Sequence, residues 1–191
     1  EAIVIDPGDD ISQVVALLEK HQLTVKQIAI THAHIDHVSG LVDPEGKAYF
    51  PNADIVMHTA EAGFWLNAEN EAKASDKSGF VTARTALAPY EGRITTLADG
   101  AEGAPGVSCV HLPGHTPGTI SSVFQVKDNG TTHTVALWGG AGLNADKASV
   151  ENYIKAAQRF SGIAKQAGAD IILANHTDWD GSKVNLPALA K

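Results

Sequence analysis

The residues with the clearest chemical potential lie at positions 31–37, which read Thr-His-Ala-His-Ile-Asp-His. Imidazole is the preferred neutral ligand of zinc, and a carboxylate supplies an anionic oxygen to a cation. Alternate residues leaving a strand point the same way, so the first two histidines can aim both rings at one ion. The segment therefore predicts a metal site with four candidate ligands, which are His32, His34, Asp36 and His37.

Two further histidines follow predicted strands later in the chain. Residues 113–118 read Pro-Gly-His-Thr-Pro-Gly, so His115 lies in a turn that glycine and proline constrain. Residues 171–176 read Ile-Ile-Leu-Ala-Asn-His, an apolar strand that ends at His176. A single histidine at a strand end is usually structural. Three strand-end loops that each deliver imidazoles predict one convergent site at the edge of a sheet.

This order of motifs resembles the metallo-β-lactamase superfamily of metal-dependent hydrolases. The resemblance runs from about residue 3 to about residue 180 and includes an opening Ile-Asp-Pro-Gly turn at 5–8. It implies an α/β (α+β) fold, arranged as a four-layer αββα sandwich, with a dinuclear zinc site at one sheet edge. For the first ion, it implies the ligands His32, His34 and His115. For the second ion, it implies Asp36, His37 and His176.

One position departs from the pattern of most dinuclear hydrolases in the superfamily. These enzymes carry an aspartate that bridges the two metals at the end of the strand predicted here over 134–138. In this chain the strand runs into Gly-Gly-Ala-Gly, which puts Gly140 at the position of the carboxylate. The true β-lactamases of the superfamily generally lack the aspartate, and one subclass uses the same six ligands. A β-lactam is therefore the favoured substrate. Partial occupancy of the second zinc site is expected, unless Asp178, Asp180 or a water replaces the carboxylate.

The resemblance and the chemistry of zinc together predict a mechanism. Zinc lowers the pKa of its bound water to about 7, and the resulting hydroxide attacks a carbonyl carbon of the substrate. Asp36 would bind the second ion, orient the nucleophile and shuttle its proton. Thr116 is a candidate hydrogen-bond donor to this site, with turn capping as an equal alternative. Two zinc ions with one carboxylate and one hydroxide leave a formal charge of about +2, which favours small anionic substrates.

Two alternative functions stay open. One is a lactone, ester or thioester hydrolase whose metal site tolerates the glycine. The first 40 residues look most like glyoxalase-type hydrolases, and residues 42–89 look more like the lactonase and organophosphate-hydrolase branch. The other is a metal-binding, catalytically weak scaffold, degenerate or engineered. Residues after Gly118 look closest to the β-lactamase-like branch, and such a mosaic fits a recombined chain and an ordinary divergent member equally. The surroundings of Gly140 distinguish an active site from a scaffold.

Composition bounds the partners of the chain. With 191 residues, 43% of them hydrophobic, the chain can bury the core of a single domain over 1–191. The formal net charge is 14 − 22 = −8, which disfavours a nucleic-acid partner. No apolar stretch approaches the roughly 20 residues of a membrane span, so no membrane partner is expected. The compartment stays open: periplasmic for a true β-lactamase, cytoplasmic otherwise.

The start of the chain predicts an exposed sheet edge. Members of the superfamily usually have several strands before the opening turn, whereas this chain starts almost on it. An unpaired edge strand is a template for pairing with another chain. Homodimerisation through that edge is the resulting hypothesis.

Hydrophobic periodicity predicts alternating helices and strands. Helices are expected at 11–21, 59–70, 71–89 and 149–167, with Thr59 as the cap of the second. Strands are expected at 3–5, 27–30, 54–58, 94–97, 107–112, 120–126, 134–138 and 171–176.

The remaining residues of interest have simpler interpretations. Cys109, the only cysteine, is expected to be a small buried residue and not a catalytic thiol. The histidines expected to serve packing, capping or surface roles are His21, His58, His111 and His133. The tryptophans expected in the core, with a substrate cleft as the alternative, are Trp65, Trp138 and Trp179.

Overall fold

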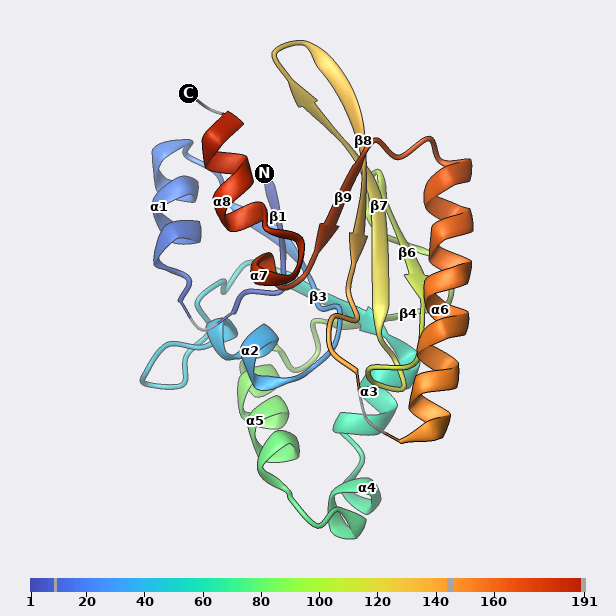
Figure 1. Cartoon of the computed structure of the whole chain (residues 1–191). Coiled ribbons are helices and arrows are strands. Elements are labelled where there is room, and N and C mark those ends of the chain that lie inside the picture. The colour runs from blue at the N-terminus through green and yellow to red at the C-terminus, as the bar shows by residue number, and fades with distance from the viewer. Residues whose placement is uncertain (9, 144–145, 190–191) are drawn as a thin grey trace. The chain divides into compact units, whose positions relative to one another are not determined.

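The computed structural model describes residues 1–8, 10–143 and 146–189, and the chain divides into two compact units, Glu1–Ala98 and Asp99–Lys191. Each unit is built on its own β-sheet with its own helices (Figure 1). The mixed α/β class predicted from the sequence, with two sheets, is confirmed. The single-domain assignment stays a prediction.

The first unit contains a four-stranded parallel sheet in the order β1-β2-β3-β4. Its strands are β1 (Ala2–Ile5), β2 (Val25–Ala29), β3 (Asp54–His58) and β4 (Ile94–Leu97). Its helices are α1 (Ser12–Lys20), α2 (Ile35–Val38), α3 (Thr59–Trp65), α4 (Ala68–Lys73) and α5 (Ser78–Leu87), with short 3₁₀ turns η1 (Ser39–Leu41) and η2 (Ala88–Tyr90). Because all four strands are parallel, the loops after β1, β2 and β3 leave the sheet at the same edge.

Helix α5 packs against α2 and η1 and contributes to the core of the first unit. The helix presents Phe80, Ala83 and Leu87 at helical spacing. Its partners include Ile28 of β2 and Ile55 of β3, which are both fully buried. Burial of these apolar side chains supplies the main stabilising free energy of the unit.

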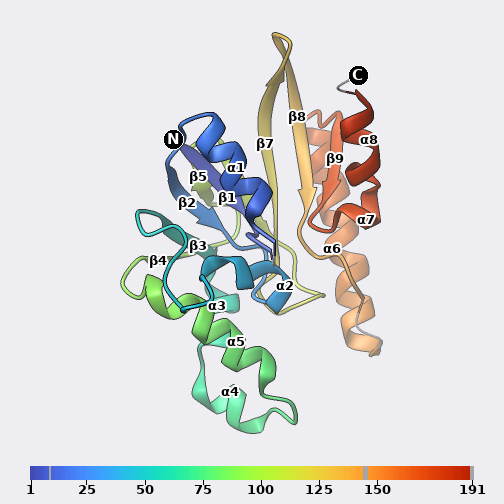
Figure 2. The ribbon, with the colours of Figure 1, turned by 90° about the vertical axis from the view of Figure 1, so that its left-hand side faces the viewer.

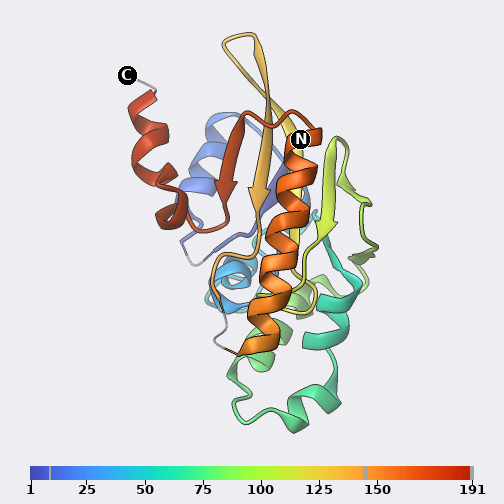
Figure 3. The same cartoon turned by 45° about the vertical axis from the view of Figure 1, so that its right-hand side comes forward.

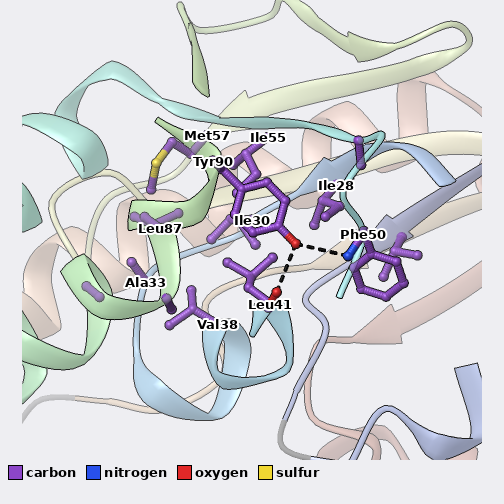
Figure 4. Packing of buried hydrophobic residues seen from close by; sticks show 14 of the residues in the cluster. Ile28, Ile30, Ala33, Val38, Leu41, Phe50, Ile55, Met57, Leu87 and Tyr90 are labelled. Carbon is purple, nitrogen blue, oxygen red and sulfur yellow. Dashed lines mark hydrogen bonds between the residues drawn. The ribbon is translucent and has the colours of Figure 1, made fainter. Parts of the chain in front are cut away.

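Tyr90 brings one polar group into that core and satisfies it (Figure 4). Its hydroxyl donates to the carbonyl of Leu41 at 2.9 Å and accepts from the amide of Phe50 at 3.3 Å. Tyr90 therefore ties the end of η1 to the loop before β3. Burial raises the pKa of its phenol above the usual value, so the ring stays neutral at physiological pH.

The second unit contains a five-stranded sheet in the order β5-β6-β7-β8-β9. Its elements are β5 (Glu102–Ala104), β6 (Val107–His111), β7 (Ile120–Asp128), β8 (Thr131–Trp138), α6 (Lys147–Gln166), β9 (Ile171–Ala174), α7 (Thr177–Asp180) and α8 (Ser182–Leu189). Strands β5 to β8 pair antiparallel, and β9 pairs parallel to β8. The strands β7 and β8 form a long hairpin (Figure 2). Strands β6, β8 and β9 thus run in one direction and end at the same edge.

Helix α6 runs along the sheet of the second unit (Figure 3). Ala156, Phe160 and Ala164 face the sheet and pack with Val110 and Ala136. The helix begins at Lys147 because the side chain of the preceding residue, Asp146, accepts the amide of Ser149 at 3.0 Å.

Most predicted elements are present, and the exceptions have local causes. The helix expected over 59–70 ends at Trp65, and Asn67 caps a new helix by accepting from the amides of Glu69 and Asn70. Thr59 is not the cap of α3. The ring Nδ1 of His58 accepts the amide of Ala60 at 3.1 Å, while the Thr59 hydroxyl donates to the carbonyl of Leu97.

Strand β5 and the short helices α2, α7 and α8 were not expected from periodicity. Each is too short, or too polar, to show a repeating apolar pattern. Among the described residues, none forms a helix of the length and hydrophobicity that crossing a bilayer requires.

Replacing Tyr90 by Phe should destabilise the protein by about 1–3 kcal/mol, because the buried Leu41 carbonyl and Phe50 amide each lose a partner. Urea unfolding of the variant measures the change. Tyr49→Phe is the matched control, since Tyr49 is 41% exposed. Equal effects of the two substitutions would contradict the assigned role.

Candidate metal centre

The loop after β2 gathers the four donors predicted at 31–37. His32 and His34 lie in the loop itself, and Asp36 and His37 lie in α2. The ring of His32 is 4.8 Å from that of His34 and 4.0 Å from that of His37, measured between centroids. The Asp36 carboxylate is 3.5 Å from Nε2 of His37. The first unit alone therefore concentrates three imidazoles and one carboxylate.

A buried carboxylate, Asp6, organises this cluster from the loop after β1. Its Oδ1 accepts the amide of Thr31 at 2.7 Å. Its Oδ2 accepts the Thr31 hydroxyl at 2.5 Å and lies 2.9 Å from Nδ1 of His37. Asp6 has φ of 48°, a left-handed conformation that aspartate tolerates better than most residues.

These contacts fix which nitrogen of each imidazole faces a metal. The Thr31 hydroxyl gives its proton to Asp6, so it accepts from Nδ1 of His32 at 3.2 Å. The Nδ1 proton of His37 goes to Asp6 directly. A histidine whose Nδ1 donates in this way uses Nε2 as its ligand atom. One carboxylate thus sets the tautomer of two candidate ligands.

The turn that carries Asp6 is itself held by close backbone packing. The amide of Gly40 donates to the carbonyl of Pro7 at 3.0 Å. A Cβ at position 40 would lie 2.2 Å from the carbonyl oxygen of Gly8, closer than any side chain permits. Glycine at position 40 therefore lets η1 approach the Asp6 turn.

In the second unit, His115 follows β6 and is held through its own Nδ1. That atom lies 3.0 Å from the carbonyl oxygen of Gly142, so Nε2 is again the ligand nitrogen. Gly142 has φ of 111°, and a Cβ there would meet the His115 ring at 3.0 Å. Only glycine allows this backbone to reach the imidazole.

Thr116 braces the His115 loop internally. Its amide donates to the Thr119 hydroxyl at 3.0 Å, and the two hydroxyl oxygens are 2.7 Å apart. The Leu112 amide donates to the Thr119 carbonyl at the base of the loop. Of the two roles predicted for Thr116, these contacts support the turn-bracing one.

His176 follows β9, and its neighbour Asn175 secures the loop around Gly140. The Asn175 amide group donates to the carbonyl of Gly139 at 2.8 Å, and its Oδ1 accepts from the amide of Ala141 at 3.3 Å. The two peptide groups that flank Gly140 are therefore both bound by one side chain. His115, Gly140 and His176 all lie in loops at one edge of the second sheet.

Gly140 has room for a small side chain. A Cβ there would lie 3.3 Å from the Thr119 methyl group, 3.5 Å from Trp138 and 3.6 Å from Cβ of His115. The Thr119 methyl would need to move by a few tenths of an ångström. The glycine thus gives the loop no carboxylate, although the fold does not forbid one.

Two aspartates after His176 were alternatives for the missing carboxylate. Asp180 accepts the amides of Ala174 at 2.6 Å and Ser182 at 2.7 Å, so both its oxygens serve the backbone. Asp178 is exposed and lies 3.9 Å from the Lys183 ammonium. Asp180 is therefore engaged by backbone amides, whereas replacement of the carboxylate by Asp178 stays a prediction.

The other histidines have structural contacts. His21 is the C-terminal cap residue of α1, and His58 caps α3. The ring of His133 pairs with Asp170 at 2.7 Å, and Nε2 of His111 lies 2.9 Å from the carbonyl of Pro117. His111 therefore adds a second brace to the His115 loop.

The tryptophans and the cysteine divide between core and surface. Trp65 belongs to the core of the first unit, and Trp138 packs on Phe160 of α6. Trp179 is 66% exposed, contrary to its predicted core position, because α7 is a single turn that buries no side chain. Cys109 is buried, as expected.

Sequence reasoning missed the residues that position the ligands. Asp6 lies 31 residues before His37, and Asn175 lies 36 residues after Gly139, so no local pattern links them. The signal that could have found Asp6 is its place directly after an apolar strand, the same place that His32 and His176 occupy.

Comparison with known proteins identifies the family. The sequence model of the metallo-beta-lactamase superfamily matches residues 1–134, which is more than half of the chain. The chain therefore belongs to the metallo-β-lactamase superfamily.

Among curated proteins, the chain is 28% identical over 160 residues to the probable polyketide biosynthesis zinc-dependent hydrolase PksB of Bacillus subtilis, covering 83% of this chain and 60% of that protein. It is 29% identical over 145 residues to the hydroxyacylglutathione hydrolase GloC of Haemophilus influenzae, covering 74% of this chain and 64% of that protein. The chain thus spans somewhat under two thirds of the length of these relatives.

Solved structures show the same fold. The hydrolase AbOPH of the β-lactamase superfamily matches with a TM-score of 0.68 and 27% identity, over 91% of this chain and 67% of that one. BJP-1, a subclass B3 metallo-β-lactamase of Bradyrhizobium japonicum, matches with a TM-score of 0.63 and 18% identity, over 97% of this chain and 71% of that one.

Asp6→Asn should weaken zinc binding by about 10- to 100-fold, because an amide cannot accept from Thr31 and His37 as the carboxylate does. Competition with a chromogenic chelator measures the affinity. Asp54→Asn, at the exposed start of β3, is the control. Equal affinity of the two variants would show that Asp6 does not orient the ligands.

Cys109 should react slowly with thiol reagents in the folded protein, because burial raises the pKa of its thiol above the ordinary value. At pH 8 the folded chain should be labelled far more slowly than the chain in denaturant. Rapid stoichiometric labelling of the folded chain would revive the interpretation of Cys109 as an active thiol.

Proposed function

We propose that this protein is a zinc-dependent hydrolase of a small carbonyl substrate, with a dinuclear site formed by the six predicted ligands. The proposed ligands of the first ion are His32, His34 and His115. Those of the second ion are Asp36, His37 and His176. The observation that carries the proposal is the fixed orientation of three imidazoles by Asp6, Thr31 and the Gly142 carbonyl. Histidines with a purely structural role would not all need to be held through Nδ1, which makes Nε2 the ligand atom of each ring.

The donor set fits zinc. Neutral imidazole and carboxylate are zinc ligands, and an acceptor behind each imidazole is the usual partner of a ligating histidine. Family membership and the name of the zinc-dependent relative PksB support the same metal. Bound zinc would supply an acidified water and a Lewis acid for the carbonyl.

Asp36 is the proposed catalytic residue of the chain itself. Its side chain is 45% exposed, whereas that of Asp6 is 7% exposed and engaged by Thr31 and His37. Asp36 is therefore the carboxylate of this loop that a substrate or water can reach. In this position it would orient the attacking water and hold its proton.

The absence of a carboxylate at Gly140 favours an anionic substrate, and we propose a β-lactam. With Asp36 as the sole proposed anionic ligand, the centre keeps a formal charge of about +2 when one hydroxide is bound. Such a centre attracts the carboxylate of a β-lactam. The six-ligand set without a bridging aspartate is the set that the resemblance assigns to one β-lactamase subclass.

Thioester or lactone hydrolysis is the second candidate. The chain is 29% identical to a hydroxyacylglutathione hydrolase over 145 residues. The surroundings of Gly140 accommodate either chemistry, because the loop is held by Asn175 and not by a side chain at position 140.

Metal content of the purified protein, paired with hydrolysis of a chromogenic β-lactam, tests the proposal. We expect one to two zinc ions per chain, turnover that chelation abolishes, and restoration by added zinc. His115→Ala should lose both the first ion and turnover, whereas His133→Ala, which removes the surface pair with Asp170, should keep both. Zinc binding with turnover only of a thioester or lactone would replace the β-lactam assignment. Zinc binding without turnover of any of these substrates would identify a scaffold.

Gly140→Asp should tighten binding of the second zinc ion by about 10-fold or more, since a carboxylate there adds an anionic ligand beside His115. Titration of the zinc-depleted protein measures both affinities. Gly140→Ala controls for the added Cβ and the shift of Thr119. No difference between the Asp and Ala variants would show that position 140 does not face the second ion.

A further inference from the structure

Glu61 is a fully buried acidic residue that the proposed chemistry does not use. It lies in α3, directly after β3, with 0% of its surface exposed. Acidic side chains are seldom fully buried, because transfer of the carboxyl group out of water costs several kcal/mol unless hydrogen bonds compensate. A leucine would fill the same interior position without that cost.

The contacts of Glu61 point to the proposed ligand loop. Its Oε1 accepts the amide of Ala33 at 2.8 Å and the indole Nε1 of Trp65 at 2.7 Å. Ala33 is the residue between His32 and His34 and is itself fully buried. A single oxygen therefore holds the peptide that separates two proposed ligands of one ion.

Trp65 extends this contact to the second of those ligands. Its ring packs edge-on against His34, with 5.5 Å between centroids and 81° between planes. Because Nε1 of the indole is bound to Glu61, the ring cannot rotate without breaking that hydrogen bond. Glu61 thus holds the backbone that precedes His34, and it also holds the Trp65 ring against which the His34 ring packs.

Rotation of the Ala33 peptide would change the directions of His32 and His34 together, since it joins them. The Thr31 hydroxyl, which is bound to Asp6, holds the Nδ1 side of His32. On the side of His34, Trp65 packs against the ring and Glu61 holds the Ala33 amide. This division assigns the two sides of the loop to two different buried carboxyl groups.

We propose that Glu61 is a positioning residue that pre-orients His32 and His34 for the first metal ion. The inference rests on the proposed zinc site and adds a residue outside the ligand motif to it. Glu61 touches neither substrate nor metal in this role. It acts through the Ala33 amide and the Trp65 indole.

Three variants test the role of Glu61, with zinc affinity and the visible spectrum of the cobalt-substituted protein as readouts. Glu61→Leu removes the acceptor and should weaken binding of the first ion by about 10- to 100-fold. Glu61→Gln keeps an oxygen at the Oε1 position and should restore affinity to near that of the wild type. Trp65→Phe keeps the aromatic ring but not the Nε1 donor, and should give a smaller loss with a shifted cobalt spectrum.

The control is Tyr90→Phe, which removes two buried hydrogen bonds in the same unit, to Leu41 and Phe50, and leaves the contacts of Ala33 and Trp65 unchanged. It should lower stability but leave zinc affinity and the cobalt spectrum unchanged. Loss of affinity in Glu61→Leu with rescue in Glu61→Gln supports the positioning role. If the Glu61→Leu variant does not fold, weakened zinc binding and a shifted cobalt spectrum in Trp65→Phe support the positioning role through the Trp65 contact.

The inference is overturned if the Leu and Phe variants, folded, bind zinc as the wild type does, or if Glu61→Gln is as weak as Glu61→Leu. Failure of the underlying proposal looks different, because the wild-type protein itself would then bind no zinc. The wild-type titration therefore separates the two failures before any variant is compared.

Discussion

The hydrogen bonds of the Asp6 carboxylate are the constraint on which the ligand loop depends. Parallel pairing of β1 with β2 brings the residue after β1 beside the residues after β2, with Ile5 opposite Ala29. Asp6 can then bind Thr31 and His37 at once. The local left-handed conformation at Asp6 costs about 1 kcal/mol or more, which three hydrogen bonds to a buried carboxylate offset. A slip of one residue between these strands would remove all three bonds.

In both units, polar residues follow strands that end at one edge of a sheet. Parallel strands end at one edge of a sheet, and the loops at that edge carry the polar residues. In the first unit these are the segments after β1, β2 and β3, which supply Asp6, residues 31–37 and, in helix α3, Glu61. In the second unit they are the loops after β6, β8 and β9. The apolar cores hold the strands, and hydrogen bonds to backbone groups then set the loops.

Sequence reasoning recovered the parts of this arrangement that are local. Apolar runs located β3 and β4 with correct bounds, and the spacing of histidines located the donor-rich loop. The residues behind the histidines were not recovered, because Glu61 lies 28 residues from the Ala33 amide that it binds. Short polar elements such as β5, with the sequence Glu-Gly-Ala, carry no periodic signal. Periodicity therefore finds elements and donors, while orientation depends on long-range contacts that only the folded chain specifies.

The carboxyl groups of the chain lie where they orient the ligand loop, and not where they would add charge at position 140. Asp6 and Glu61 are buried behind the loop, where they bind Thr31, His37, Ala33 and Trp65. At position 140 the chain has a glycine and no carboxylate, and Asn175 holds the loop with a neutral amide. Negative charge behind an imidazole raises its basicity as a ligand without occupying a coordination position. The chain thus orders the ligand loop with two buried carboxyl groups, whereas position 140 adds no carboxyl group to the second unit.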